Sequence, residues 1–158
     1  MEIKFNSTVL IVKDLSSMKS FYKDLLKLDV EVDFGNCIGF KSGFSLWKLT
    51  EDYPISKKLG RTFDDAGNKN LELCFETEDF NEVEKTLKNY NLNYLHKTTE
   101  ETWGQKTIRL YDPENNLIEI GETVPCFVKR FYHQGMSTQE VSERTSVPID
   151  WVNRICAE

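Results

Sequence analysis

The sequence predicts an α+β fold: two βαβββ modules forming a curved mixed sheet around a cup, with a C-terminal helical appendage. An apolar stretch that passes through an acidic turn into an amphipathic helix occurs twice, first from Val9 and again from Leu71. From Val124 onward the strand-like pattern gives way to helical spacing of apolar residues. Two like modules bury their faces against each other, which leaves a concave site between them. We therefore expect a paired-module domain over 1–123 and a helical tail over 124–158.

Length and composition fit a small globular protein. The chain of 158 residues is 39% hydrophobic and 12% aromatic, which excludes a disordered chain. Neither a signal peptide nor an apolar run of the ~18 residues that a membrane span needs is recognisable, so a cytoplasmic protein without a membrane partner is expected. The net charge of −6 argues against nucleic-acid binding and favours a small-molecule ligand.

The first module begins with a strand over 3–13, where residues alternate and then run apolar. Asp14 or Ser16 can cap the helix that follows. Its apolar positions follow helical spacing and are Met18, Phe21, Tyr22, Leu25 and Leu28. Three antiparallel strands are then expected over 30–34, 37–41 and 44–49, separated by Gly35-Asn36 and Ser42-Gly43, which tolerate the positive φ of hairpin turns.

The second module repeats this order after a connection over 50–69, which lacks periodicity and is expected to run over the cleft as a lid or binding loop. Its elements are expected as a strand over 70–77, a helix over 81–89, and strands over 93–98, 106–112 and 117–122.

The tail is expected to form three helices. The first carries the stripe Phe127, Val128, Phe131 and Tyr132 and ends at Gly135. The second begins at a capping box, in which Ser137 caps and Glu140 reaches back, and has Val141 on its apolar face. The third is indicated by Pro148, Trp151, Val152 and Ile155.

Residues 137–155 resemble a helix-turn-helix of bacterial regulators, but the charge of the tail argues against DNA binding. The tail cations Lys129, Arg130, Arg144 and Arg154 are balanced by Glu140, Glu143, Asp150 and Glu158. A DNA-binding surface needs an excess of basic residues to neutralise phosphates. We therefore expect a packing hairpin that shields sheet surface or mediates contacts in a homodimer.

The two modules resemble the vicinal oxygen chelate superfamily, which includes glyoxalase I, extradiol dioxygenases and bleomycin-resistance proteins. The resemblance covers roughly residues 5–122. The segments that carry it are Val12-Lys13-Asp14-Leu15, Phe21 to Leu28, Trp103-Gly104 and Asp112 to Glu119. It implies a small-molecule site in the cup and, in the metal enzymes of the family, a divalent ion held by the first and last strands of both modules.

The four ligand positions that the resemblance implies fall at Ser7, Trp47, Glu72 and Glu119. Ser7 is a poor ligand and Trp47 has no ligating atom, whereas Glu72 and Glu119 supply carboxylate oxygens. Two carboxylates facing each other repel, so one stays protonated or both bind a cation. A tight nickel or zinc site is not expected; a weakly held Mg²⁺ or Mn²⁺ is left open, as is a register slip that turns Glu72 outward.

Several other side chains are candidates for the ligand site. Aromatic rings that could stack on a ligand, or simply fill the core, are Phe40, Phe44, Trp47, Tyr53, Phe63, Trp103 and Tyr111. Arg109 would meet an anionic ligand, pair with a cup glutamate, or lie solvated at a sheet edge. His96 and His133 lie away from the ligand positions, and surface roles are expected for them.

The four cysteines show no Cys-x-x-Cys spacing and are interpreted as reduced thiols, with a disulfide or metal role as the alternative; they are Cys37, Cys74, Cys126 and Cys156.

Three functions remain open. The favoured one is a binding protein for a small, partly aromatic molecule, without a tight catalytic metal. The second is a metal-dependent lyase or isomerase of the glyoxalase type, or a dioxygenase-like enzyme, in which Glu72 or Glu119 would shuttle a proton. The third is a ligand-responsive regulator that uses the tail. The sequence does not decide between enzyme and receptor.

Overall fold

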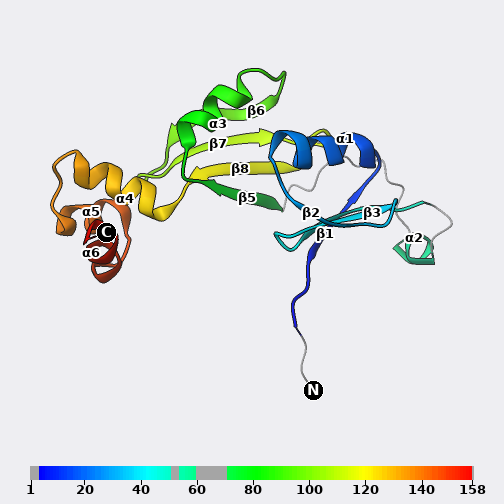
Figure 1. The fold of residues 1–158 in the computed structure, drawn as a ribbon, viewed down its shortest axis with the longest axis horizontal. Helices are drawn as coiled ribbons and strands as arrows, with labels where there is room; N and C mark the ends of the chain where they lie inside the picture. Colours follow the sequence, from blue (N-terminus) through cyan, green and yellow to red (C-terminus); the bar gives the residue numbers. More distant parts are fainter. Residues whose placement is uncertain (1–3, 51–53, 60–70, 158) are drawn as a thin grey trace. The chain divides into compact units, whose positions relative to one another are not determined.

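The computed structural model describes residues 4–50, 54–59 and 71–157, and the chain forms two compact units (Figure 1). The first unit comprises Met1–Asn68 together with Asp112–Asn116, and the second comprises Lys69–Tyr111 together with Leu117–Glu158. Each unit contains one mixed, four-stranded sheet, so the predicted α+β fold of two similar modules is confirmed. The shared cup concerns the arrangement of the two units and stays a prediction.

The sheet of the first unit has the strand order β1-β4-β3-β2, in which β1 and β4 are parallel and the other pairs antiparallel. Its strands are β1 (Thr8–Val12), β2 (Val30–Asp33), β3 (Cys37–Phe40) and β4 (Phe44–Lys48). All four lie within the predicted ranges, and the first is shorter than expected. The turn before β4 requires Gly43, whose φ of 76° lies in the left-handed region.

Helix α1 (Leu15–Lys19) continues directly into the π-helix η1 (Ser20–Leu25). Asp14 caps it, because its carboxylate accepts hydrogen bonds from the backbone N–H groups of Ser16 and Ser17. The helix ends before Leu28, contrary to the prediction, because Lys27 adopts a φ of 59°. Helix α2 (Pro54–Leu59) lies within the connection for which no periodicity was expected.

Tyr22 is the centre of the first core, with no exposed surface. Its ring packs edge-on against Phe21, and the ring centroid of Phe44 lies 4.8 Å away. Its hydroxyl donates to Asp112 Oδ2 at 2.8 Å. Burial, followed by the charge of Asp112, raises the pKa of Tyr22 well above its ordinary value, so the phenol stays a donor.

The turn that contains Asp112 belongs to the first unit although it connects two strands of the second. Asp112 Oδ1 accepts hydrogen bonds from the backbone N–H groups of Glu114 and Asn116 at 2.9 Å each. Glu114 Oε1 in turn accepts from the backbone N–H groups of Lys13 and Asp14, at 2.7 Å each. The motif that carries part of the family resemblance therefore holds the start of α1 in place.

In the second unit the strand order is β5-β8-β7-β6, with β5 and β8 parallel. Its strands are β5 (Glu72–Thr77), β6 (Asn93–Glu100), β7 (Lys106–Tyr111) and β8 (Leu117–Glu122). Helix α3 (Phe80–Leu87) begins after Asp79, whose carboxylate accepts from the Glu82 N–H at 3.0 Å. This order repeats that of the first unit, as the duplicated pattern predicts.

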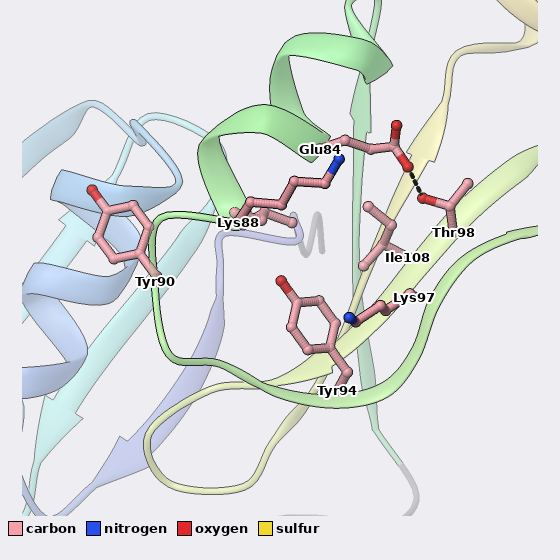
Figure 2. Close-up of a pocket in the computed structure, with 8 residues that line it drawn as sticks. Glu84, Lys88, Tyr90, Tyr94, Lys97, Thr98 and Ile108 are labelled. Atoms are coloured by element: carbon pink, nitrogen blue, oxygen red, sulfur yellow. Dashed lines mark hydrogen bonds between the residues drawn. The ribbon is translucent and has the colours of Figure 1, made fainter.

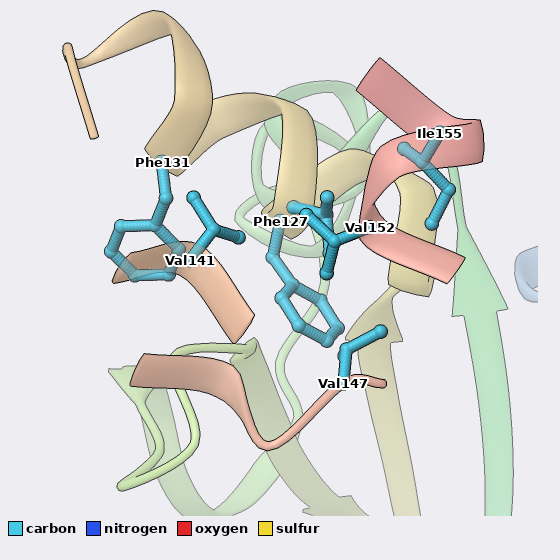
Figure 3. Packing of buried hydrophobic residues seen from close by; sticks show 7 residues of the cluster. Phe127, Phe131, Val141, Val147, Val152 and Ile155 are labelled. Carbon is cyan, nitrogen blue, oxygen red and sulfur yellow. The ribbon is translucent and has the colours of Figure 1, made fainter. Parts of the chain in front are cut away.

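The predicted three-helix tail is confirmed as α4 (Val124–His133), α5 (Thr138–Thr145) and α6 (Ile149–Ala157). The capping box at Ser137 and Glu140 is present with both of its hydrogen bonds. The helices enclose a core of their own, shown in Figure 3; its buried members are Phe127, Val128, Phe131, Val141, Val147, Val152 and Ile155. Among the described residues, no helix combines the length and apolar character needed to cross a membrane.

Two arginines fix the tail to the loop between β6 and β7. Arg130 donates to Glu122, Glu100 and the Gly104 carbonyl, and Arg144 donates to Glu100 and the Thr102 carbonyl. Gly104, at a φ of 91°, lies directly against the ring of Phe131. The loop conformation and the tail core therefore depend on each other.

Replacing Tyr22 by Phe removes one hydrogen bond from the buried Asp112 carboxylate. We expect a stability loss of about 1–3 kcal/mol, measured by urea denaturation, because a buried charged acceptor loses a donor. Tyr90→Phe is the matched control, because Tyr90 is 49% exposed; its effect should stay within about 0.5 kcal/mol. Equal effects of the two substitutions would contradict the role assigned to the Tyr22 hydroxyl.

Gly104→Ala should destabilise the protein more than Gly135→Ala. Both glycines have positive φ, but a Cβ on Gly104 would lie 2.5 Å from a ring carbon of Phe131, whereas a Cβ on Gly135 meets nothing within 4 Å. The extra loss is expected to be about 1–3 kcal/mol, the usual cost of overpacking. Paired thermal melts measure the difference, and equal losses would show that the Phe131 ring moves aside freely.

Candidate functional site

The two faces of the second sheet differ in chemistry. Ile108 and Ile118 lie on the face covered by α3 and are buried. Arg109 and Glu119, which are register partners on β7 and β8, point to the other face, as does Cys74, the partner of Glu119 on β5. Side chains alternate between the two faces along a strand. Cys74, Arg109 and Glu119 therefore lie side by side on this second face.

Arg109 is the hub of this face. Its Nε donates to Glu72 Oε1 at 2.7 Å, its Nη1 donates to Glu101 Oε1, and its Nη2 donates to Glu119 Oε2. Nη1 also lies 3.2 Å from His96 Nε2. We call these five residues the Arg109 cluster. Side-chain exposure is only 18% for Arg109 and 12% for Glu119, so the ion pairs are largely shielded from water.

Hydrogen-bond chemistry fixes the tautomer of His96. Its Nδ1 lies 2.8 Å from the Lys97 carbonyl oxygen, which can only accept, so Nδ1 carries a proton. Its Nε2 faces the guanidinium of Arg109, which can only donate, so Nε2 is unprotonated. His96 is therefore neutral in this arrangement and presents a lone pair to the cluster.

Glu72 and Glu119 lie on one sheet face and share Arg109 as their partner. Glu72 points to the same face as Glu119, so the register slip that would turn it away is absent here. The two carboxylates do not confront each other across empty space, because the Arg109 guanidinium binds both. Of the alternatives for Arg109, pairing with a glutamate is the one the structure contains.

The pKa values of Glu119 and Glu101 shift in opposite directions although both carboxylates bind Arg109. Burial raises the pKa of Glu119, and the charges of Glu72 and Glu101 add to this effect despite the pull of Arg109. Burial also acts on Glu101, but hydrogen bonds from Arg109 and Thr107 outweigh it and leave the pKa of Glu101 below its ordinary value. Burial lowers and the glutamates raise the pKa of Arg109, with a net increase, so it stays charged.

Cys74 shares this face but is a weak nucleophile. Burial, followed by the charges of Glu119 and Glu72, raises the pKa of its thiol. The thiol therefore stays protonated near neutral pH, and the protonated form is unreactive. All four cysteines are free thiols, in agreement with the reduced interpretation.

In the first unit, Ser7 and Trp47 lie on the sheet face opposite the buried Leu46. Ser7 Oγ lies 2.9 Å from Ser45 Oγ. Trp47 is half-buried on β4, opposite Ile11. Phe40 is only 2% exposed and stacks on Phe44, so the core alternative holds for both rings.

The remaining candidates that the structure describes form no hydrogen bond with the Arg109 cluster, although Tyr111 lies two residues after Arg109 and so on the same sheet face. Trp103 is 40% exposed in the loop after β6, and its Nε1 donates to Gln105. Tyr111 is half-buried at the end of β7. Tyr53 and Phe63 lie outside the described residues.

Two members of the cluster, Glu101 and His96, were not predicted as site residues, and His96, for which a surface role was expected, also contacts Arg109. His96 is half-buried and is the register partner of Arg109 on β6. Glu101 follows β6 directly and reaches back to Arg109 and Thr107. A single arginine among alternating apolar residues of β7 was the one sequence signal that pointed to nearby carboxylates.

The residues do not fit the divalent ion that the family resemblance implies. Trp47 has no atom that ligates a metal ion, the Ser7 hydroxyl is hydrogen-bonded to Ser45, and both glutamates bind Arg109. Within 4–50, 54–59 and 71–157, no group of three or more His, Cys, Asp or Glu side chains is arranged to hold a metal ion. A coordination set for a tight ion would require these side chains to rearrange.

A pocket of about 200 Å³ lies on the opposite, α3-covered face of the second sheet (Figure 2). Its lining includes the apolar side chains of Leu87 and Ile108 together with Tyr94 and Lys97. Glu84, at its edge, accepts a hydrogen bond from Thr98. Arg109 follows Ile108 on β7 and points away, so this pocket is separate from the Arg109 cluster.

Glu101 and Glu119 lead to opposite pH dependences of stability. Because the pKa of Glu101 is lowered in the folded protein, its stabilising contribution is present at neutral pH and is lost as pH falls through the folded-state value. Because the pKa of Glu119 is raised, its contribution is greatest at low pH. That contribution declines as pH rises from the unfolded-state pKa to the folded-state one.

We therefore expect Glu101→Gln to be most destabilising near pH 7 and progressively less so in acid. Glu119→Gln, which resembles the protonated form, should instead gain stability relative to the wild type as pH rises. Thermal unfolding of both variants and the wild type between about pH 3.5 and pH 7 tests this, since unperturbed carboxyl groups titrate near pH 4. Difference curves that slope in the same direction would contradict the assignment.

Comparison with known proteins agrees with this fold. A glyoxalase-like domain model matches residues 5–125. Metallothiol transferase FosB of Staphylococcus saprophyticus is 28% identical over 116 residues, which are 73% of this chain and 74% of the relative. A protein of unknown function from Agrobacterium tumefaciens superposes with a TM-score of 0.69 at 28% identity, covering 78% of this chain and 97% of its own.

A glyoxalase/bleomycin resistance protein/dioxygenase family enzyme from Burkholderia phytofirmans has a TM-score of 0.62 at 14% identity, covering 77% of this chain and all 100% of its own; this likeness concerns the fold alone. The family model, in contrast, spans most of the sequence and both sheets. The chain therefore belongs to the glyoxalase-like domain family, within the vicinal oxygen chelate superfamily.

Proposed function

We propose that the protein binds a small organic ligand through its glyoxalase-like domain and holds no tight catalytic metal. One observation carries the proposal: Glu72 and Glu119, at the two ligand positions that keep carboxylates, are both bound by Arg109. A carboxylate oxygen engaged by a guanidinium offers little to a divalent ion, because the positive charge beside it repels the ion.

The Arg109 cluster is suited to recognition by hydrogen bonds. Three carboxylates and one guanidinium supply several acceptors around a fixed donor, all on a half-buried face. Charged groups in such surroundings form stronger hydrogen bonds than in water. A ligand with polar groups would be oriented there by exchange with one of these pairs.

The first unit, taken by itself, has a sheet face with exposed apolar side chains. Val9 is 48% exposed, and Ile11 and Trp47 are register partners on the same face. A tryptophan in place of a metal ligand adds a broad apolar surface that can stack on a planar group.

A metal-dependent enzyme is the second candidate, and the retained carboxylates of Glu72 and Glu119 favour it. The relative named metallothiol transferase agrees with this class of chemistry, although it is only 28% identical. Elemental analysis of the purified protein separates the candidates: a stoichiometric transition metal favours the enzyme, and its absence after purification in metal-containing buffer favours the receptor.

Tryptophan fluorescence should report ligand binding. The chain has three tryptophans, and we expect a saturable change with members of a library of small aromatic compounds and antibiotics. Trp47→Phe should abolish most of this change, because Trp47 lies on the proposed ligand face. Trp151→Phe is the control and should retain it, since Trp151 is 42% exposed on α6. A signal that stays flat across the whole library would count against the binding role.

A further inference from the structure

We propose that Arg109 is the built-in cation of this site, and that its guanidinium prevents the surrounding carboxylates and His96 from closing around a divalent metal ion. The inference rests on the metal-free part of the proposed function and is independent of ligand identity. It makes Arg109 the residue that decides whether this member of the family binds metal.

The side chains that surround Arg109 are of the types that bind metal ions. Glu72, Glu101 and Glu119 contribute carboxylate oxygens, and neutral His96 contributes the lone pair of Nε2. Mixed sets of carboxylate and imidazole ligands suit Mn²⁺ and Zn²⁺. Glu101 and His96 are not at positions that the family resemblance assigns to a metal, so this set differs from the one the fold implies.

The donors are also held by partners other than Arg109. Thr107 donates to Glu101 Oε1 at 2.8 Å, and His96 Nδ1 donates to the Lys97 carbonyl at 2.8 Å. Such outer hydrogen bonds orient ligating side chains in metal sites. Removal of the guanidinium would therefore leave these two side chains near their present positions.

The negative charge of the three carboxylates would drive cation uptake if Arg109 were removed. Without Arg109, three carboxylates on a half-buried face would lose the guanidinium that pairs with all of them. Uncompensated buried charges are strongly unfavourable, so the site would take up protons or a cation. In the wild type the guanidinium is protonated at every accessible pH, so it remains between the carboxylates and no pH change removes it.

Geometry explains why arginine and metal exclude each other. The donors lie around the edge of a planar guanidinium, with Glu72 at Nε, Glu101 and His96 at Nη1, and Glu119 at Nη2. A metal ion needs its oxygen ligands at about 2.0–2.2 Å from one centre. The donors must therefore move inward, which the flexible glutamate side chains can do only when the guanidinium has left.

Arg109→Ala should convert the protein into a divalent-metal protein. After incubation with Mn²⁺ or Zn²⁺ and gel filtration, we expect about one ion per chain in the variant and none in the wild type, measured by elemental analysis. Bound Mn²⁺ should also lose its free-ion EPR signal. Arg109→Lys is the matched control: it keeps a positive charge at this position and should bind no ion. Arg109→Ala combined with Glu119→Gln removes one donor and should bind at least tenfold more weakly.

Arg109→Gln tests the inference if the alanine variant does not fold, because glutamine fills more of the space and still donates to a carboxylate. Circular dichroism establishes that each variant is folded. The inference is overturned if folded Arg109→Ala and Arg109→Gln both leave Mn²⁺ free, or if the wild type binds an equal amount. A wild-type protein that binds no library compound contradicts only the proposed ligand role, whereas a stoichiometric ion in the wild type contradicts both proposals.

Discussion

Charge compensation on a half-buried sheet face is the constraint on which the second unit depends. The Arg109 cluster places three carboxylates where water cannot solvate them fully, and one guanidinium neutralises them jointly. Arg130 likewise pairs with two carboxylates, those of Glu100 and Glu122. The two clusters meet at consecutive residues, because Glu100 pairs with the tail arginines while Glu101 pairs with Arg109.

Local signals in the sequence were sufficient for most of the fold. Asp14 caps α1, the capping box at Ser137 begins α5, and apolar spacing placed the other two helices of the tail. These features depend on residues within one or two helical turns, so spacing and capping chemistry reveal them directly. The duplicated pattern also predicted the order of strands and helix along each module, whereas the order of strands within each sheet came from the structure.

The candidate site was harder to predict because it depends on pairing between strands. His96 faces Arg109 only through the register of β6 and β7, which shifts twice along the pair. Glu101 reaches the cluster from a loop. Neither arrangement follows from the residue types, and the π-helical form of η1, which contains the buried Tyr22, was likewise not predicted.

The attachment of the tail bears on how this protein should be handled in the laboratory. A chain truncated after Thr123, where the family match nearly ends, would lose Arg130 and leave the Glu122 carboxylate, which is 8% exposed, without its guanidinium. The ring that covers Gly104 would be lost as well. Expression of the glyoxalase-like portion alone would thus yield an impaired second sheet, and any loss of function in that fragment would report damaged folding rather than a role of the tail in recognition.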